Sequence, residues 1–125
     1  MIFLSRRKAG YVRGSISQHS SPIFCVKKAT GSWGIVNAFN KLNDATIPSQ
    51  TLIPHKDMVL STIPSREIVS AIDLVDWSYQ ILTKDSDIPF TAVSIPNGMQ
   101  WEMLVMSQGL KNAPATFNWM VTQVV

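Results

Sequence analysis

Cysteine is nearly absent from this sequence: Cys25 is the single one among 125 residues. One cysteine excludes an internal disulfide bond and any zinc site built from several cysteines. A chain without disulfides fits a reducing compartment, so we expect an intracellular protein. Charged residues are also scarce, at 15%, while hydrophobic residues reach 46%. This composition excludes a disordered chain and indicates a globular domain with a modest core.

Long apolar runs are missing as well, since no stretch of the sequence is long enough to cross a bilayer. The apolar start, from Met1 to Leu4, comes before Arg6, Arg7 and Lys8. A secretory signal has the opposite order, with positive charges followed by a longer apolar run. We therefore expect neither a membrane span nor secretion.

Acidic residues are almost missing from the first half of the chain. Residues 1–56 contain eight Lys and Arg against one Asp, a net charge of +7, whereas residues 57–125 contain three against seven Asp and Glu, a net charge of −4. A basic half attracts phosphate, and an acidic half can hold divalent cations. Many solvated surfaces have a similar pattern, so charge alone leaves nucleic-acid binding and an ordinary surface both open.

The first half of the sequence predicts a β-hairpin followed by a loop and a short helix. Residues 22–28 and 33–38 are typical of strands, with turn-forming residues at 30–32 between them. Cys25 lies within the first of these strands, and we expect it to be a buried apolar residue. Two prolines predict an extended loop over 44–56. A helix is expected from Lys56 to Ile63, ended by Pro64.

The second half predicts further strands and helices, which makes the expected fold class α+β. The apolar run 67–74 is typical of a buried strand, and a short helix is expected over 76–83. Residues 89–95 and 99–105 flank the turn-forming pair Asn97-Gly98, which predicts a second hairpin. Asn112 can cap a final helix that begins at Ala113 and tolerates Pro114 in its first turn.

Asp73 ends the predicted strand at 67–74, and its sequence context allows two interpretations. A carboxylate at the end of a buried strand costs free energy unless it is paired or bound to a cation. It can bind Mg²⁺, which prefers hard oxygen ligands. Alternatively, Asp73 or Asp76 can cap the short helix that follows. The residues alone leave both open.

Four motifs in order then point to a known family. The predicted hairpin contains SSP at 20–22, VKK at 26–28 and GSW at 31–33, and NKLN follows at 40–43. Residues 72–76 are IDLVD, with YQI at 79–81. The last motif is VMSQGLKNAPATF at 105–117. This order and spacing closely resemble the reverse transcriptases of Ty3/gypsy LTR retrotransposons, from about residue 10 to the end. The resemblance implies a partial right-hand polymerase fold, with a fingers hairpin and an incomplete palm.

The resemblance also implies an organisation along the chain. A basic N-terminal segment covers residues 1–20, the fingers cover 21–66, and part of the palm and fingers covers 67–125. This last part carries the first metal-binding aspartate motif and the Gln-Gly loop-helix motif. The activity implied is RNA-directed DNA polymerisation, with Mg²⁺ as cofactor and with a primed RNA or DNA template and deoxynucleoside triphosphates (dNTPs) as partners.

Individual residues receive roles through the same resemblance. Asp73 would be the catalytic metal ligand, helped by the main-chain carbonyl of Leu74. Lys27 and Trp33 of the hairpin would contact the template. The remaining roles concern the nucleotide. Lys28 would neutralise the γ-phosphate, and the backbone at Asp76 and Trp77 would face the triphosphate. Ser78 would face the ribose, and Gln108 with Gly109 would line the pocket.

Several positions depart from the family pattern. Gly34 stands where the family usually has an arginine, so a guanidinium contribution is lost. Ser78 stands where an aromatic residue usually bars ribonucleotides. Its neighbour Tyr79 is one residue away and is expected to point elsewhere. Trp77 and Ser107 also replace the usual small residue and proline.

The family's second metal motif, an aromatic-x-Asp-Asp turn, does not occur in these 125 residues. Nor do the rest of the palm, the thumb or the RNase H region, which would have to come from elsewhere. One carboxylate cannot hold two Mg²⁺ ions, so we expect these 125 residues alone to be an inactive fragment. Two alternatives remain open: a non-catalytic module that binds nucleic acid or protein, and a decayed fragment without function.

Overall fold

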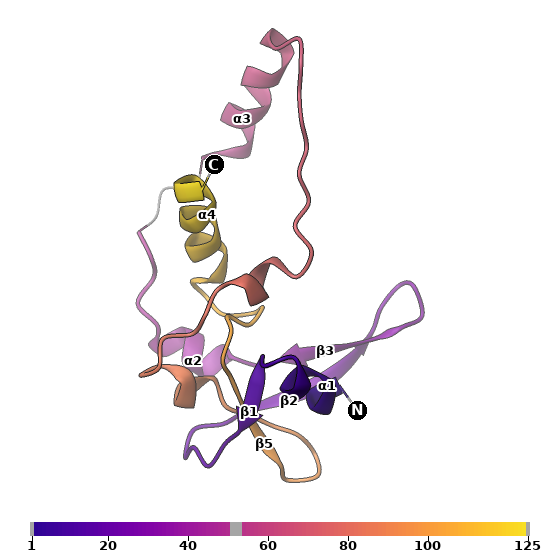
Figure 1. Ribbon diagram of the computed structural model, residues 1–125, viewed down its shortest axis with the longest axis vertical. Coiled ribbons are helices and arrows are strands. Elements are labelled where there is room, and N and C mark those ends of the chain that lie inside the picture. Colours follow the sequence, from indigo (N-terminus) through magenta and orange to yellow (C-terminus); the bar gives the residue numbers. More distant parts are fainter. Residues whose placement is uncertain (1, 51–53, 125) are drawn as a thin grey trace.

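The computed structural model describes residues 2–50 and 54–124 and shows the mixed α and β architecture that the sequence predicts (Figure 1). Three strands follow the first helix, a run of helical segments comes next, and two strands precede the last helix. In chain order the elements are α1 (Ile2–Lys8), β1 (Val12–Gly14), β2 (Ser21–Lys27), β3 (Trp33–Asn37), α2 (Asn40–Ala45), α3 (Lys56–Thr62), η1 (Ile63–Ser65), η2 (Trp77–Gln80), η3 (Ile88–Thr91), β4 (Val93–Ser94), β5 (Gln100–Met103) and α4 (Ala113–Val124).

The strands form one five-stranded sheet in the order β1-β5-β4-β2-β3. The pairs β1–β5, β4–β5 and β2–β3 are antiparallel, whereas β2 and β4 are parallel. In the hairpin, Lys27 lies opposite Trp33 and Val26 lies opposite Gly34. The tip of this hairpin projects away from the body of the molecule (Figure 1).

The core lies where α1 covers the short strands of the sheet. Its buried members are Phe3, Val12, Phe39, Val93, Trp101 and Met103. The rings of Phe3 and Trp101 are stacked with their centroids 6.0 Å apart. The sequence pattern did not indicate α1, β1 or α2, because with three to seven residues each they are too short to show a period. Phe3 and Val12 nevertheless supply two of the core side chains.

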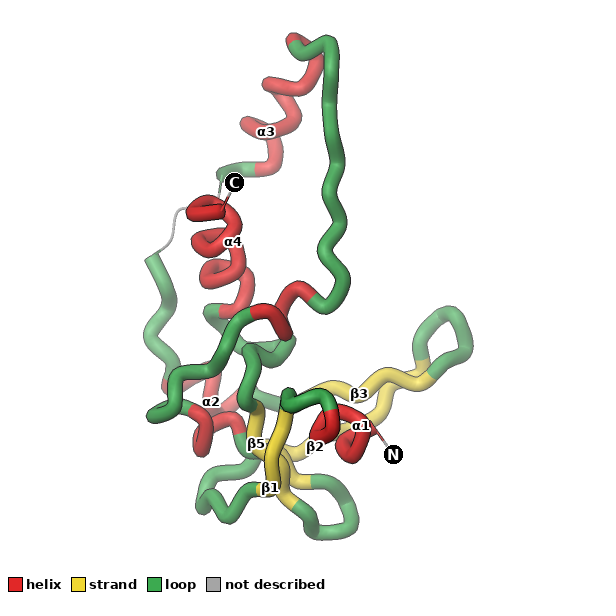
Figure 2. Tube along the Cα trace, viewed as in Figure 1, coloured by secondary structure: helices red, strands yellow, loops and turns green. Residues whose placement is uncertain are grey.

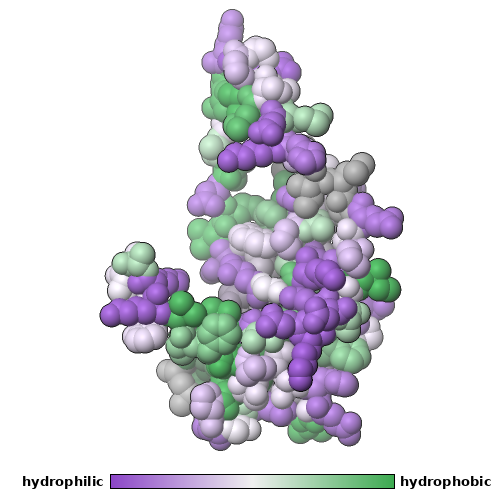
Figure 3. All heavy atoms as spheres, turned by 180° about the vertical axis from the view of Figure 1, so that it is seen from behind, coloured by the Kyte–Doolittle hydropathy of each residue, from purple (hydrophilic) through white to green (hydrophobic). Residues whose placement is uncertain are grey.

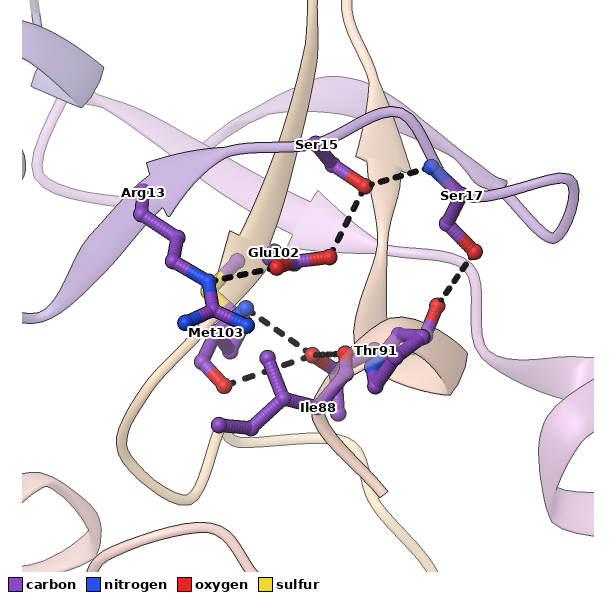
Figure 4. Close-up of polar contacts among 8 residues, drawn as sticks. Arg13, Ser15, Ser17, Ile88, Thr91, Glu102 and Met103 are labelled. Carbon is purple, nitrogen blue, oxygen red and sulfur yellow. Dashed lines mark hydrogen bonds and ion pairs between the residues drawn. The ribbon is translucent and has the colours of Figure 1, made fainter. Parts of the chain in front are cut away.

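A buried carboxylate ties β1 to β5 (Figure 4). The Nε of Arg13 donates to Oε1 of Glu102 at 2.5 Å, and the Oγ of Ser15 donates to Oε2 at 2.9 Å. The side chain of Glu102 is only 9% exposed. A buried charge is tolerated when it is paired and hydrogen-bonded, so these two donors explain how Glu102 can lie inside.

Thr91 joins η3 to β5 in the same region (Figure 4). Its Oγ1 donates to the carbonyl of Ile88 at 2.7 Å and accepts a hydrogen bond from the backbone N–H of Met103 at 2.8 Å. Thr91 is buried, so neither backbone group can turn to water instead.

Thr91→Val is expected to lower the free energy of unfolding by about 1–3 kcal/mol. Valine keeps the shape but leaves a buried N–H and carbonyl without their partner. Urea denaturation would measure the change. Thr30→Val is the matched control, because Thr30 lies exposed at the tip of the hairpin. Equal effects of the two substitutions would contradict the role assigned to Thr91.

Both predicted hairpins are confirmed. The first forms from β2 and β3, and the second from β4 and β5 with Gly98 at φ 86° in its turn. The strand predicted over 89–95 was too long, because its first part belongs to η3 and only Val93–Ser94 pairs with β5. Burial of Cys25 was predicted wrongly: its thiol is free and exposed. A strand in a sheet usually buries one face, but this part of β2 lies in the projecting hairpin, where nothing covers it.

The predicted buried strand over 67–74 is wrong. This stretch has no regular structure in the described chain and is exposed throughout, with Ile68 at 87% and Ile72 at 81% exposure. It runs as a long loop between η1 and η2, drawn green in Figure 2. A strand requires a neighbouring strand for its backbone hydrogen bonds, and the strands described here pair only with one another. Apolar side chains consequently lie at the surface in this part of the molecule, seen from behind in Figure 3.

The three helices predicted from the sequence are largely confirmed. Helix α3 ends just before Pro64, a 3-10 turn (η2) stands for the short helix expected over 76–83, and α4 begins at Ala113. The side chain of Asn112 does not cap α4. It bonds the loop before α3 instead, donating to the carbonyl of Ile47 and accepting from the N–H of Ser49, both at 2.9 Å. None of the helices found in 2–50 and 54–124 has the length and apolarity that a bilayer span requires.

Candidate functional site

A small cavity of about 190 Å³ lies between β3 and the loop that precedes α4. Helix α1 and η2 contribute one side chain each to its wall. The lining residues are Arg6, Ile35, Val36, Asn37, Tyr79, Ser107, Gln108 and Gly109. Two residues singled out from the sequence, Gln108 and Gly109, therefore share a cavity with side chains that are far away along the chain.

Hydrogen bonds from neighbouring elements fix the loop at this cavity. The side-chain Nδ2 of Asn43 donates to the carbonyl of Gly109 at 2.8 Å, and Oδ1 of Asn43 accepts from the N–H of Lys111 at 2.9 Å. The Nδ2 of Asn37 donates to Oγ of Ser107 at 2.9 Å. Gly109 has φ 95°, a conformation in which glycine is strongly favoured. The Gln-Gly pair is thus held in one geometry against β3.

The 3-10 turn η2 brings its residues toward the same region. Asp76 precedes it with φ 50°, and its carbonyl accepts from the N–H of Tyr79 at 2.9 Å. Trp77 packs on Phe117 of α4, with ring centroids 4.6 Å apart. Ser78 is fully buried, and its hydroxyl finds no hydrogen-bond partner among the described residues. Tyr79 is the member of η2 that reaches the cavity.

The residues predicted on the hairpin lie apart from this cavity. Lys27 and Trp33 face each other near its tip, where Trp33 is 66% exposed. The side chain of Lys28 lies across Gly34: a Cβ added to Gly34 would come within 2.9 Å of Cε of Lys28. The space beside the backbone at position 34 is therefore taken by the stem of the lysine.

Asp73 and Leu74 lie in the exposed stretch between η1 and η2 and do not line the cavity. A carboxylate and a main-chain carbonyl are the hard oxygen donors that Mg²⁺ prefers. Within 2–50 and 54–124, however, no group of three or more His, Cys, Asp or Glu is placed to hold a metal ion. The donors fit magnesium in kind but are too few for two ions.

A larger cavity, of about 540 Å³, lies between α2, η3 and the start of α4. Its wall is mainly apolar, with side chains such as Leu42, Ile81, Phe90 and Met106. None of the candidate residues from the sequence lines it. The smaller cavity is the better candidate for a binding site, because it gathers polar groups and the cation of Arg6 around the Gln-Gly loop.

Known proteins resemble this chain over nearly its whole length. Over 121 residues, 93% of the chain, it is 37% identical to the retrovirus-related Pol polyprotein from transposon opus of Drosophila melanogaster. It is 33% identical over 120 residues, again 93% of the chain, to the enzymatic polyprotein of soybean chlorotic mottle virus. In structure, the protease-reverse transcriptase of prototype foamy virus matches 98% of the chain and 16% of that protein, with a TM-score of 0.83 and 22% identity.

The chain is a reverse-transcriptase-like segment of a retroelement Pol polyprotein. It spans 12% of the opus polyprotein and 17% of the viral one. No protein-family model matches it. The family membership and the partial polymerase fold expected from the four motifs are confirmed.

Three residues that line this cavity were missed by the sequence motifs: Arg6, Asn37 and Tyr79. Tyr79 was expected to point elsewhere than Ser78, and its side chain does take a different direction: Ser78 is buried, whereas the tight turn of η2 directs Tyr79 to the cavity, beside Arg6 and Tyr11. Asn37 is the last residue of β3, four residues after the GSW motif of the hairpin, and that closeness to a motif is the one sequence signal that pointed to it. Arg6 carried no signal beyond its charge.

Proposed function

We propose that this segment supplies the fingers and the nucleotide-binding side of an RNA-directed DNA polymerase, which transfers dNTPs onto a primer. One observation carries the proposal: the Gln108-Gly109 loop is held against β3 over a cavity, in a chain 37% identical to a Pol polyprotein. Glycine at φ 95° leaves the backbone open to close approach, which a nucleotide pocket requires.

The other nucleotide contacts of the proposal come from η2 and the hairpin. Asp76 and Trp77 would present backbone N–H groups to the triphosphate, since oriented amides favour anions. Lys28 would neutralise the γ-phosphate. By the family pattern Ser78 would take the position that faces the ribose, but its side chain is fully buried, so it would give no steric barrier to a 2′-hydroxyl.

Magnesium binding belongs to the same proposal. Asp73 and the carbonyl of Leu74 would hold it, with further ligands from outside these 125 residues. When bound, two such ions stabilise the attacking and leaving oxygens of an in-line displacement. The exposure of Asp73 leaves its carboxylate accessible for this purpose.

Template contact is proposed for the hairpin. Lys27 and Trp33 are exposed opposite each other near its projecting tip. A cation and an aromatic ring can bind the phosphates and stack on the bases of a nucleic acid. A structure of the foamy viral protease-reverse transcriptase contains an RNA/DNA hybrid, which supports nucleic acid as the partner.

The nucleotide proposal is tested by titrating the chain with dATP and Mg²⁺ in a calorimeter. Gln108→Ala is expected to weaken binding about tenfold, because a side-chain hydrogen bond at the pocket is lost. Gln80→Ala is the matched control, since Gln80 is exposed on η2 and does not line the cavity. Equal affinities of the two variants would count against the pocket.

The exposed basic hairpin also favours a second candidate function, that of a non-catalytic nucleic-acid-binding module. This candidate needs neither Asp73 nor the Gln-Gly loop. Binding of a single-stranded oligonucleotide should then weaken steeply with salt and be unchanged by Gln108→Ala. Binding without salt dependence would argue against it.

A further inference from the structure

Arg6 is the cationic group in the wall of the small cavity. It is half-buried near the end of α1, whereas its neighbour Arg7 is exposed. Its guanidinium carbon lies 5.7 Å from the ring centroids of both Phe3 and Tyr79. Cation–π contacts of this kind hold a guanidinium in place without using its N–H donors. Arg6 is therefore oriented by two rings.

The guanidinium of Arg6 has no hydrogen bond and no ion pair with any residue in 2–50 or 54–124. The wall of the cavity also contains no Asp or Glu. Besides Arg6, its polar side chains are the hydroxyl and amide groups of Asn37, Tyr79, Ser107 and Gln108. The cavity thus combines a positive charge without a counter-ion and neutral hydrogen-bonding groups, which is the composition of an anion site.

The volume of the cavity and its hydrogen-bond donors indicate which kind of anion it can bind. Its volume of about 190 Å³ is below the roughly 300 Å³ at which whole small-molecule sites begin. A single phosphate group fits better than a complete nucleotide. The planar guanidinium fork matches two phosphate oxygens at once, and the amide of Gln108 can donate to another.

We propose that Arg6 binds a phosphate group of the ligand at the Gln108-Gly109 loop. This inference rests on the proposed function, because it assigns the same cavity to part of the nucleotide. The phosphate can belong to a nucleoside triphosphate or to the backbone of a nucleic acid. Arg6 thereby joins α1 to a binding site formed otherwise by β3, η2 and the loop before α4.

The test compares Arg6→Met with Arg7→Met in the 125-residue chain at low salt. Both variants lose one positive charge, but only Arg6 lines the cavity. Calorimetric titrations use inorganic tripolyphosphate, dATP, and a primed oligonucleotide as separate ligands. Arg6→Met is expected to weaken tripolyphosphate binding at least about tenfold, as for loss of a charge-assisted bond. Arg7→Met is expected to change it less than about twofold.

The ligand that shows the Arg6 effect identifies the source of the phosphate. Dependence with dATP assigns it to the nucleotide, and dependence with the oligonucleotide alone assigns it to the nucleic acid. Tripolyphosphate binding that depends on Arg6, without any dATP binding, supports the anion site and counts against the proposed function. Conversely, dATP binding that depends on Gln108 supports the function and, when none of the three ligands depends on Arg6, overturns the inference.

Equal weakening by Arg6→Met and Arg7→Met would also overturn the inference, because it would show a general effect of charge. So would a wild-type chain that binds none of the three ligands. Circular dichroism of each variant checks the fold, since Arg6 packs on Phe3 and Tyr79. If Arg6→Met does not fold, Arg6→Lys replaces it. The wild-type NMR spectrum is then also recorded with tripolyphosphate: shifts of the side-chain amide signals of Gln108 and Asn37 would support the anion site, and unchanged signals would overturn it.

Discussion

Asp73→Asn is expected to abolish template-dependent primer extension in a chimera that carries this chain in place of the matching segment of the opus polyprotein. The loss should be about a thousandfold or more, because a neutral amide is a poor ligand for Mg²⁺ and the developing charge on the transferred phosphoryl group would lose its stabilisation. Extension of a labelled primer on an RNA template would measure it.

The control for this substitution is Asp57→Asn. Asp57 is exposed in the first turn of α3, so its loss changes the net charge equally without touching the site. The isolated 125-residue chain should show no extension at all, since Asp73 stands in no group of three metal-binding side chains within the described residues. Extension by the isolated chain that Asp73→Asn removes would contradict this expectation.

Phe39→Ala is expected to lower the free energy of unfolding by about 3–5 kcal/mol, which is a large part of the stability of a small domain. Phe39 is 1% exposed in the core. It also supports the site, because its ring lies 3.8 Å from the position of a Cβ on Gly109. The substitution removes the ring and leaves a cavity under the Gln-Gly loop. Urea denaturation would measure the loss.

Two further variants make the Phe39 experiment decisive. Phe39→Leu keeps most of the apolar volume and should cost less than about 1.5 kcal/mol. Phe24→Ala removes a ring that is 51% exposed on the hairpin and should have a small effect. If Phe24→Ala destabilised the chain as strongly as Phe39→Ala, the burial of Phe39 would not be what stabilises the fold.

The sequence predicted those elements whose formation depends on residues close by along the chain. Both hairpins were predicted because turn-forming residues, such as Asn97-Gly98, stand between two apolar segments, and α3 and α4 because proline fixes one end of each. The strand over 67–74 failed for the opposite reason. Its apolar pattern is typical of a strand, but a strand forms only when another strand lies beside it. The residues of 67–74 cannot indicate whether such a partner strand is present.

The candidate site was only partly predictable for a similar reason. Gln108 and Gly109 form part of a recognisable motif, so they could be named from the sequence. Arg6, Asn37 and Tyr79 reach the same cavity from three other elements, and only the folded chain brings them together. Arg6 in particular looked like one of several basic residues near the start, and its contacts with Phe3 and Tyr79 distinguish it from Arg7.

The projecting hairpin has a practical consequence. Its exposed thiol, Cys25, is the single one in the chain, so a maleimide dye would label every molecule at one position without any substitution. The dye would lie on β2, two residues from Lys27, which is proposed to contact the template. Fluorescence from that one position would report on whatever approaches the hairpin, and on changes around Ile35, the cavity residue that lies opposite Cys25 in the register.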